Sequence, residues 1–401
     1  MRLLDRLILP VLALGLAALA VVPDLIGIGV PGFGVWEIAL LVTSLGLLLA
    51  SLVLPVRPIT AVQRMLADSK AGWREISLLS FSVVVTGVTA DLLLGFLLPP
   101  TYVAITKYGW AVPADTVQHR TIEDTPGQFR EVTTRYFQNG FKRWGKPDTG
   151  KRKMFVIGDS ITEAVQVSNG EEWYSYLENQ LSNVELYVYG AGGYGSLQEY
   201  MVFDDYIDSI HPDLILWQYC SNDYDNNLYE LDLLDYPHNN HAVRPYLEEN
   251  KIVYRLPLLY AKLRQYSFIA DRLMKKYDIF IMSHRTRQDF RDLTEADIVR
   301  RKLLEEKSYH VTVEIMKNVK KRAKEIPIYF FNPCANSFER DQKLASETGI
   351  VFLSGIAEYM NERREGREVK VRNDGHWNKL GNQLAGERLV KMFNELDIMK
   401  E

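Results

Sequence analysis

Cysteine is scarce in this chain, which has two, Cys220 and Cys334, among 401 residues. Two thiols are too few for a disulfide scaffold or a zinc cluster, so the fold must depend on a hydrophobic core. An excess of positive charge is also missing, because 47 Lys and Arg stand against 51 Asp and Glu and leave a net charge of -4. This balance gives no indication of a nucleic-acid partner. The sequence contains no internal repeat and no low-complexity tract.

Long apolar runs are present at the start of the chain and absent from the rest. Three of them cover about residues 7–28, 35–54 and 76–98, whereas the polar and charged residues lie mostly after residue 100. A helix needs about 20 apolar residues to cross a hydrocarbon core of about 30 Å. The sequence therefore predicts a membrane domain over residues 1–100 with three transmembrane helices, followed by a water-exposed part.

Basic residues are unevenly placed around these runs. They precede the first run and separate the second from the third, whereas the segment between the first and second has none. Because Lys and Arg accumulate on the cytoplasmic side, we expect a cytoplasmic N-terminus and a large domain outside the cytoplasmic membrane. If the first run is instead a cleaved signal peptide, that location is unchanged. The basic residues that flank the apolar runs are Arg2, Arg6, Arg57, Arg64, Lys70 and Arg74.

Short apolar stretches alternate with helix-like stretches beyond residue 150. Such a pattern is typical of an α/β fold whose parallel sheet is covered by helices on both faces. We interpret the polar segment 101–150 as a stalk and domain edge, and residues 151–398 as the domain itself. Strands are expected at 153–157, 184–189, 214–219, 326–331 and 350–353, and helices at 173–181, at 197–210 and from about 380.

A long insertion, at about residues 226–321, separates the third and fourth expected strands. Within it, 230–236 and 246–253 look irregular, and 256–277 and 294–323 look helical. Its position favours a lid or a substrate-binding element over the carboxyl ends of the strands. A structural extension that packs on the sheet is an equally good interpretation.

The first expected strand ends in Gly158-Asp159-Ser160, and a helix-compatible stretch follows. This arrangement lifts the Ser160 hydroxyl out of the end of the sheet, towards the amides of a helix N-terminus. A serine held there can be a nucleophile if a base reaches it. By itself the tripeptide is a weak indication, because it occurs by chance in many loops.

Glycines follow the second strand and an asparagine follows the third. The four glycines between Gly190 and Gly195 let the backbone turn tightly and approach a ligand closely. They favour a backbone N–H aimed at an oxyanion over a dinucleotide site, which would need an acidic residue about 20 positions further on. Asn222 can present its amide to a developing negative charge, or it can simply cap a turn.

His376 precedes the last expected helix, two residues after Asp374. Histidine is the most frequent general base, because its pKa lies near neutrality. Asp374 can accept a hydrogen bond from the far ring nitrogen and so fix the tautomer. The plainer interpretation is a polar loop histidine at the surface.

Taken in order, these residues resemble the conserved blocks of the SGNH hydrolases, also called the GDSL esterase/lipase superfamily. The resemblance implies a flavodoxin-like three-layer sandwich with a five-stranded parallel sheet, and no metal or cofactor. It implies a catalytic triad of Ser160, His376 and Asp374, and an oxyanion hole formed by Ser160, Gly193 and Asn222. The matching segments are Gly158-Asp159-Ser160, Gly190 to Gly195, Cys220-Ser221-Asn222-Asp223 with Cys in place of Gly, and Asp374-Gly375-His376.

Two features of the resemblance leave alternatives open. Many members of the superfamily carry Asp-x-x-His, and that spacing falls on Asn373 here, so either Asp374 or Asn373 neighbours the imidazole. The Asp-x-His spacing resembles that of membrane-associated exopolysaccharide acetylation proteins. In the implied sheet, strands three and four are neighbours, so Cys220 and Cys334 are either joined in a disulfide or present as two thiols.

The resemblance and the membrane segment together predict a membrane-anchored serine esterase or O-acyltransferase. Its expected substrates are acyl esters, above all O-acetyl esters, of an exported or cell-surface glycan. Expected partners are the acylated glycan, the lipid bilayer, and a membrane acyltransferase or polysaccharide-export proteins. The alternatives are a lipid esterase or lysophospholipase at the membrane surface, and a non-catalytic glycan-binding component. Four aromatic residues either stack on sugar rings or belong to the core: Tyr194, Trp217, Tyr219 and Trp377.

Overall fold

The protein divides into two compact units, Met1–Leu93 and Leu94–Glu401. A computed structural model describes residues 87–88, 91–92, 103–125, 127–146, 150–181, 183–235, 244–254, 267–270, 294–333, 337–372 and 374–398. In these ranges no helix is long and apolar enough to cross a membrane. Apart from residues 87–88 and 91–92, which are helical, the three apolar runs lie outside the described residues, so the membrane domain stays a prediction.

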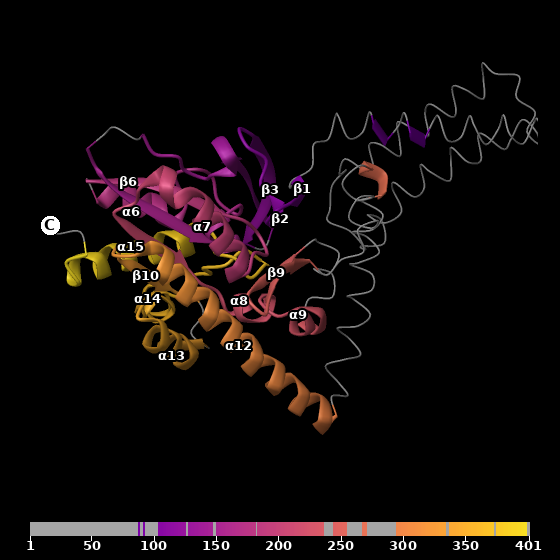
Figure 1. Cartoon of the computed structure of the whole chain (residues 1–401). Helices are drawn as coiled ribbons and strands as arrows, with labels where there is room; N and C mark the ends of the chain where they lie inside the picture. Colours follow the sequence, from indigo (N-terminus) through magenta and orange to yellow (C-terminus); the bar gives the residue numbers. More distant parts are fainter. Residues whose placement is uncertain are drawn as a thin grey trace, which may run out of the picture. The chain divides into compact units, whose positions relative to one another are not determined.

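Five parallel strands form the central sheet of the second unit, which Figure 1 shows as a whole. Their order is β11-β10-β7-β5-β6. Each of the five expected strands is present, and the third and fourth are neighbours. The strands are nearly continuous apolar runs because both faces of the sheet are covered. They are β5 (Arg152–Gly158), β6 (Val184–Gly190), β7 (Leu214–Gln218), β10 (Ile328–Phe331) and β11 (Val351–Phe352).

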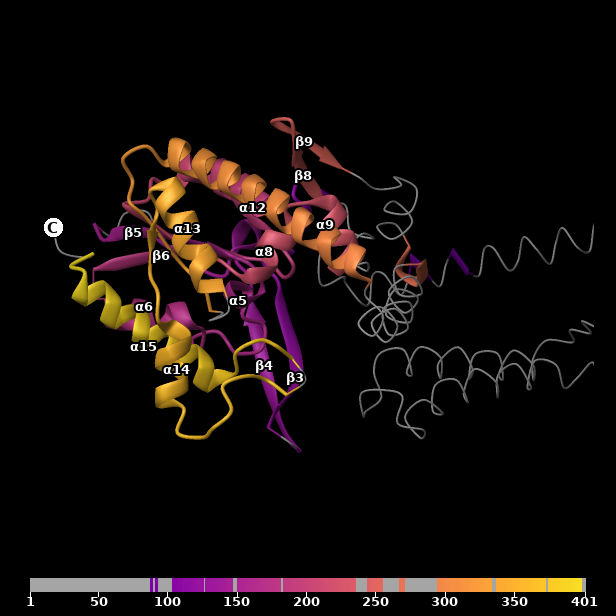
Figure 2. The same ribbon diagram turned by 90° about the horizontal axis from the view of Figure 1, so that it is seen from below.

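Helices cover both faces of this sheet. Successive side chains of a strand point to opposite faces, so Phe155 and Ile157 enter one core and Met154 and Val156 the other. Figure 2 shows the strands between the two helical layers. The first layer contains α7 (Ser196–Ile210), α12 (Glu295–Ala323) and α13 (Phe338–Thr348), and the second contains α6 (Trp173–Gln180), α14 (Ile356–Arg363) and α15 (Lys379–Glu395). The expected three-layer α/β sandwich is confirmed.

The segment 101–150 is more regular than the interpretation as a stalk and edge suggests. It holds two antiparallel hairpins, and Tyr136 and Phe141, which follow them, are fully buried in the first core. The sequence did not reveal them, because β1 and β2 are too short for a recognisable period and β3 and β4 are mostly polar. The strands are β1 (Val103–Thr106), β2 (Gly109–Ala111), β3 (Val117–Thr125) and β4 (Gln128–Arg135), and a short 3-10 helix η1 (Gln138–Gly140) follows.

The described parts of the insertion are also regular. The prediction of irregular structure was wrong at both places, because 230–236 overlaps a helix and 246–253 a hairpin. The helix expected at 256–277 lies almost wholly outside the described residues, whereas the one expected at 294–323 is α12. The elements are α8 (Ser221–Asn226), α9 (Tyr229–Asp235), β8 (Pro245–Glu248) and β9 (Lys251–Tyr254).

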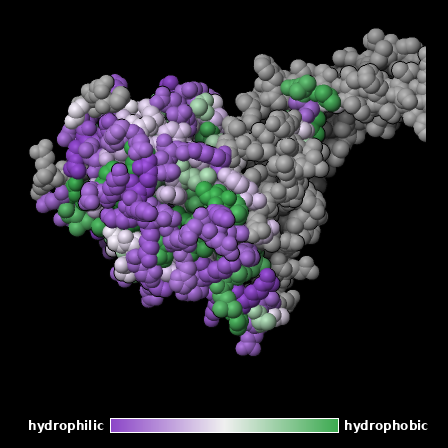
Figure 3. Space-filling model, viewed as in Figure 1, coloured by the Kyte–Doolittle hydropathy of each residue, from purple (hydrophilic) through white to green (hydrophobic). Residues whose placement is uncertain are grey.

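The buried side chains of helix α12 lie in its C-terminal part, and the residues directly before them, Glu305 to Lys307, form ion pairs with α13 and α9. Its buried residues begin at Ser308, and Thr312, Val313 and Met316 line the contact with α7 and α8. The N-terminal part carries exposed apolar side chains, including Leu303. Figure 3 shows hydrophobic atoms scattered over an otherwise mostly hydrophilic face. This helix therefore fits the interpretation of the insertion as a structural extension, at least over its buried half.

Candidate active site

Three strand ends bring the candidate residues to one edge of the sheet. Strand β5 lies between β6 and β7, so the loops after these strands are neighbours. Ser160 follows β5 as the first residue of the one-turn helix α5 (Ser160–Glu163). The Asp159 carboxylate caps this helix by accepting a hydrogen bond of 2.9 Å from the Ile161 backbone. Burial raises the pKa of the Asp159 carboxyl group.

Ser160, His376 and Asp374 form a continuous chain of contacts. The Ser160 Oγ lies 2.7 Å from His376 Nε2, and His376 Nδ1 contacts Asp374 Oδ1. Asp374 Oδ1 also accepts a hydrogen bond of 3.1 Å from the His376 backbone N–H, which holds carboxylate and ring together. Of the two residues that the Asp-x-His spacing left open, Asp374 is the one in contact with the imidazole, and Asn373 lies outside the described residues.

A tight turn presents the imidazole to the serine. The Val371 N–H donates to the His376 carbonyl at 3.0 Å, and the Asp374 N–H donates to the Val371 carbonyl at 3.2 Å. Immediately afterwards Asn378 caps α15 by accepting a hydrogen bond of 3.0 Å from the Gly381 N–H. The turn is thus closed on one side and anchored to a long helix on the other, so the position of His376 is well defined.

Opposing effects set the protonation of this pair. Burial disfavours the charged imidazole, but the hydrogen bond and charge of Asp374 outweigh it and raise the pKa of His376 above its ordinary value. Burial alone would raise the pKa of Asp374, but the hydrogen bonds from His376 and Gln166 and the charge of His376 lower it to about 2. Asp374 therefore stays ionised near neutral pH and favours a proton on the neighbouring ring nitrogen.

Gln166 is a member of this site that the sequence did not reveal. It is buried, and its Nε2 donates a hydrogen bond of 3.0 Å to Asp374 Oδ2. Arg130 of the β3–β4 hairpin donates to the Gln166 carbonyl at 3.1 Å, and Arg372 pairs with Glu123 of the same hairpin at 2.8 Å. The hairpin that the sequence analysis overlooked therefore borders the loop that carries the histidine.

The glycines after β6 let the backbone lie close to helix α5, as their number suggests. A Cβ on Gly190 would lie 2.3 Å from the backbone nitrogen of Glu163, which is too short for any side chain. Gly193 has a φ of 74°, in the left-handed region that favours glycine. The strand therefore passes directly against α5, and the following turn is free to expose backbone amides.

Glu163 joins the nucleophile helix to this glycine turn. One carboxylate oxygen accepts a hydrogen bond of 2.7 Å from the Gly192 N–H, and the other accepts one of 2.8 Å from the Tyr136 hydroxyl. Glu163 is fully buried, so both bonds are protected from water. Because it lies three residues after Ser160, the helix and the turn keep a fixed separation.

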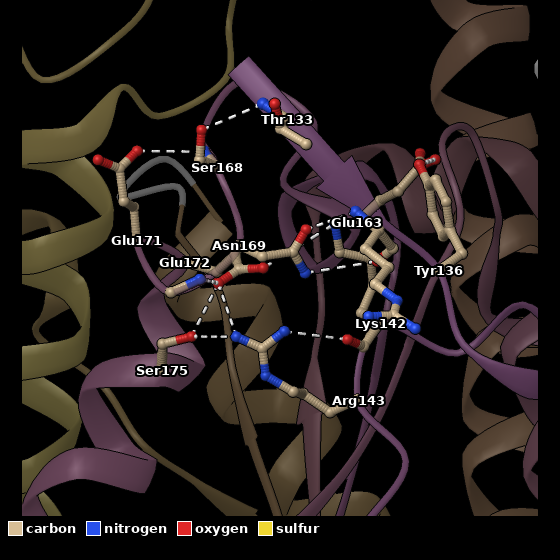
Figure 4. Close-up of polar contacts among 12 residues, drawn as sticks. Thr133, Tyr136, Lys142, Arg143, Glu163, Ser168, Asn169, Glu171, Glu172 and Ser175 are labelled. Atoms are coloured by element: carbon tan, nitrogen blue, oxygen red, sulfur yellow. Dashed lines mark hydrogen bonds and ion pairs between the residues drawn. The ribbon is translucent and has the colours of Figure 1, made fainter. Parts of the chain in front are cut away.

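A buried ionic cluster lies beside Glu163 (Figure 4). Glu172 accepts hydrogen bonds from Arg143 at 3.2 Å and from Ser175 at 2.7 Å, and Lys142 Nζ lies 4.0 Å from its other oxygen. Desolvation lowers the pKa of Lys142 to about 8, although Glu172 and Glu163 oppose this effect. These groups connect the first residues after the hairpins to α6.

Asn222 begins α8 beside the same edge. Its Nδ2 donates to Asn226 Oδ1 at 3.2 Å. Asp223 accepts a hydrogen bond of 2.7 Å from the Cys220 N–H and closes the turn in which Asn222 lies. The disulfide suggested for Cys220 and Cys334 stays a prediction, because Cys334 lies outside the described residues.

The aromatic residues suggested for sugar stacking belong to the protein core. All four are almost fully buried, and the Trp217 indole N–H donates to Glu199 in the interior. No group of acidic, histidine or cysteine side chains with metal-binding geometry occurs in the described part of the chain. The four buried aromatic residues are Tyr194, Trp217, Tyr219 and Trp377.

Several solved structures resemble the second unit. One is a lipolytic protein of the G-D-S-L family from Veillonella parvula, with 12% identity over 61% of this chain and 98% of that chain and a TM-score of 0.35. Another is the esterase EstA from a Pseudoalteromonas species, with 10% identity, coverage of 62% and 100%, and a TM-score of 0.35. A third is an acetyl-xylooligosaccharide esterase from a Geobacillus species, with 11% identity, coverage of 61% and 95%, and a TM-score of 0.34.

A search among curated protein sequences found no match. A family profile described as GDSL-like lipase/acylhydrolase matches residues 154–389, which is more than half of the chain. The matched range begins in β5, directly before Ser160, and includes His376 as well as the glycine turn. The chain therefore belongs to the GDSL-like lipase/acylhydrolase family and is an SGNH-type serine hydrolase or esterase.

Proposed function

We propose that the protein is a membrane-anchored serine esterase or O-acyltransferase that acts on O-acetyl esters of an exported or cell-surface glycan. The observation that carries the proposal is the chain of contacts from Ser160 through His376 to Asp374. A hydroxyl group 2.7 Å from an imidazole, whose other nitrogen faces a carboxylate, has the relationship that activates serine for attack on an ester.

The proposed reaction has two half-reactions. In the first, His376 removes the Ser160 proton as Oγ bonds to the ester carbonyl carbon, and the carbonyl oxygen takes the negative charge. The backbone N–H groups of Ser160 and Gly193 and the side chain of Asn222 hold that oxygen. The bond to the alcohol then breaks, and His376 gives its proton to the departing oxygen. In the second, water or a sugar hydroxyl attacks the acyl-enzyme by the same steps and restores Ser160.

The substrate class rests on features of the sequence. The Asp-x-His spacing of Asp374 and His376 resembles that of membrane-associated exopolysaccharide acetylation proteins. The three apolar runs and their flanking charges would hold the domain at the outer face of a cytoplasmic membrane, where exported glycans are displayed. The mostly exposed basic stretch 363–372 precedes His376 and would favour an acidic glycan or lipid headgroups. If the enzyme is a transferase, its acyl group would come from a membrane acyltransferase or an export partner.

The primary experiment compares the wild-type protein with Ser160→Ala on p-nitrophenyl acetate and with a fluorophosphonate label. We expect the variant to lose both turnover and labelling while it keeps its melting temperature. Ser209→Ala is the matched control, because Ser209 is exposed at the end of α7 and donates a hydrogen bond of 2.9 Å to the Tyr206 carbonyl of the same helix. Unchanged turnover in Ser160→Ala would refute the assignment of the nucleophile.

The second experiment tests the substrate class. Mass spectrometry of surface glycans from cells with the wild-type protein and with Ser160→Ala should show a change in O-acetyl content. More acetyl in the Ser160→Ala cells indicates a hydrolase, and less indicates a transferase. An unchanged glycan, together with a strong preference for long-chain over acetyl esters in vitro, would instead support the lipid esterase.

A further inference from the structure

The glycine turn after β6 is held by three side chains from three separate parts of the chain. The Gly192 N–H is held by Glu163, at 2.7 Å. The Gly192 carbonyl accepts a hydrogen bond of 3.0 Å from the Trp110 indole N–H. The Gly193 carbonyl accepts one of 2.7 Å from Arg244 Nη2. Three consecutive peptide planes are therefore each fixed by one side chain.

The contact of Trp110 sets the direction of the Gly193 N–H. A peptide unit is planar and, in the described structure, trans, so the Gly192 carbonyl and the Gly193 N–H point in opposite directions from one plane. A donor that holds the carbonyl oxygen also aims the N–H. Because Gly193 has no side chain and a φ of 74°, its own conformational preference would not hold this direction.

Arg244 holds the other side of the same residue. It comes from the insertion, directly before β8, and is only 1% exposed. Its Nη1 donates to Gln198 Oε1 at 2.6 Å, and its guanidinium lies 4.9 Å from the centre of the Trp110 ring. The Arg244 guanidinium thus fixes the peptide plane after Gly193. It also packs on the Trp110 indole, which fixes the peptide plane before Gly193.

A buried carboxylate anchors Arg244 and reaches the second loop of the site. Asp232 of α9 is fully buried, and its Oδ2 lies 3.4 Å from Arg244 Nε and accepts a hydrogen bond of 2.7 Å from Tyr246. Its Oδ1 accepts a bond of 2.8 Å from Asn226, which in turn accepts from Asn222. The insertion therefore supplies the charged pair that links the glycine turn to the asparagine loop.

We infer that Trp110 and Arg244 are positioning residues that aim the Gly193 amide at the reacting carbonyl oxygen. The inference rests on the proposed function, in which that amide is an oxyanion donor. Such donors act only at about 2.7–3.1 Å from the oxyanion, so their direction must be set before the substrate arrives. In this site the direction is set by the β1–β2 hairpin and by the insertion, and not by the central sheet.

Trp110→Phe is the sharpest test, because it keeps an aromatic ring beside Arg244 and Tyr194 and removes the indole N–H together with part of the ring system. We expect kcat on p-nitrophenyl acetate to fall about 10- to 100-fold, with KM nearly unchanged. The reason is that a misdirected Gly193 amide stabilises the transition state less, whereas binding of the ester depends little on it. Inactivation by a p-nitrophenyl phosphonate ester should slow by a similar factor. The acidic limb of the pH profile should not move, because His376 is untouched.

Arg244→Lys is the second variant. It keeps a positive charge beside Asp232, so no buried charge is left unpaired, but one ammonium group does not reproduce the forked contact with Gly193 and Gln198. We expect a fall in kcat of the same order, with a cooperative thermal transition retained. Trp144→Phe is the matched control, because Trp144 is half-buried and its ring packs on three residues outside the site: Phe141, Tyr187 and Tyr206.

The outcomes separate this inference from the proposed function. An unchanged kcat in both Trp110→Phe and Arg244→Lys, with an active wild type and an inactive Ser160→Ala, would overturn the inference alone. A fall of equal size in Trp144→Phe would also overturn it, because the loss would then come from packing. An inactive wild type or an active Ser160→Ala variant would overturn the proposed function itself.

Discussion

Gln166 donates a hydrogen bond of 3.0 Å to Asp374 Oδ2, the carboxylate oxygen that does not contact His376. The carboxylate is therefore held on both sides, by the imidazole on one oxygen and by a buried amide on the other. The two residues are more than 200 positions apart in the sequence, and the contact orients Asp374 without touching the substrate.

Replacement of this amide should weaken catalysis without abolishing it. In Gln166→Leu, Asp374 loses one charge-assisted hydrogen bond, and such bonds contribute about 1.5–3 kcal/mol. We expect kcat/KM for p-nitrophenyl acetate to fall about tenfold, while fluorophosphonate labelling of Ser160 continues at a lower rate. Gln383→Ala is the control, because Gln383 is half-buried and bonds to Glu387 of the same helix, α15. Equal activities of Gln166→Leu and wild type would argue against a role in orientation.

The pH dependence should follow the raised pKa of His376. The base must be neutral to accept the serine proton, so activity is lost as the pH falls through this pKa. Because the pKa lies above the ordinary value of 6.5, the acidic limb of kcat/KM should have its midpoint above pH 6.5.

Asp374→Asn removes the group that raises the pKa of His376. The midpoint of the acidic limb should therefore move to lower pH, and kcat should fall by up to about 10⁴-fold, because the tautomer is no longer fixed. Steady-state kinetics between pH 5 and pH 9 test both effects. If the midpoint of the acidic limb of the pH profile is the same in Asp374→Asn as in the wild type, a group other than His376 controls it.

Glu163→Gln should affect both stability and catalysis. The Glu163 carboxylate accepts two hydrogen bonds, but the nitrogen of a glutamine accepts none, so one buried donor loses its partner. The expected cost is about 1–3 kcal/mol in the free energy of unfolding, measured by urea denaturation. If the lost bond is the one to Gly192, kcat should fall as well. Tyr136→Phe is the comparison, because it removes the hydrogen bond to the Glu163 oxygen that does not contact the turn, and it should leave kcat nearly unchanged.

Gly190→Ala should destabilise the domain through a backbone clash. The new Cβ would lie 2.3 Å from the Glu163 nitrogen and 2.6 Å from the Thr162 carbonyl carbon, neither of which can move freely. Forced overpacking of this kind costs about 1–3 kcal/mol or more, which thermal melting will detect. Gly375→Ala is the control for stability, because its Cβ would meet nothing within 4 Å. Similar melting temperatures for the two variants would contradict the close approach of β6 to α5.

Much of the central fold could be predicted from the sequence. The strands β5, β6 and β7 are buried on both faces and so appear as apolar runs, and the long α12 begins at a clear Thr294 cap. The hairpins β1–β2 and β3–β4 could not be found in this way. Strands β1 and β2 have only four and three residues, which is too short for a recognisable period, and β3 and β4 are mostly polar, with much of β4 exposed.

The sequence by itself determined the chemistry available to this protein. Gly158-Asp159-Ser160, Gly193, Asn222 and His376 stand in an order that the family shares, and each follows a strand or precedes a helix whose local pattern is clear. Local pattern decides such features, because strand ends and helix starts depend on neighbours in the chain.

Tertiary structure alone decided which groups support that chemistry. It brought Asp374 to the imidazole, Gln166 to Asp374, and Trp110 and Arg244 to the glycine turn. It also placed the aromatic candidates in the core. Apart from the contact between Asp374 and His376, which are two positions apart, these contacts join residues from 51 to 208 positions apart, and no local propensity encodes them. They exist because the parallel sheet gathers its loops at one edge, where buried polar groups must find partners.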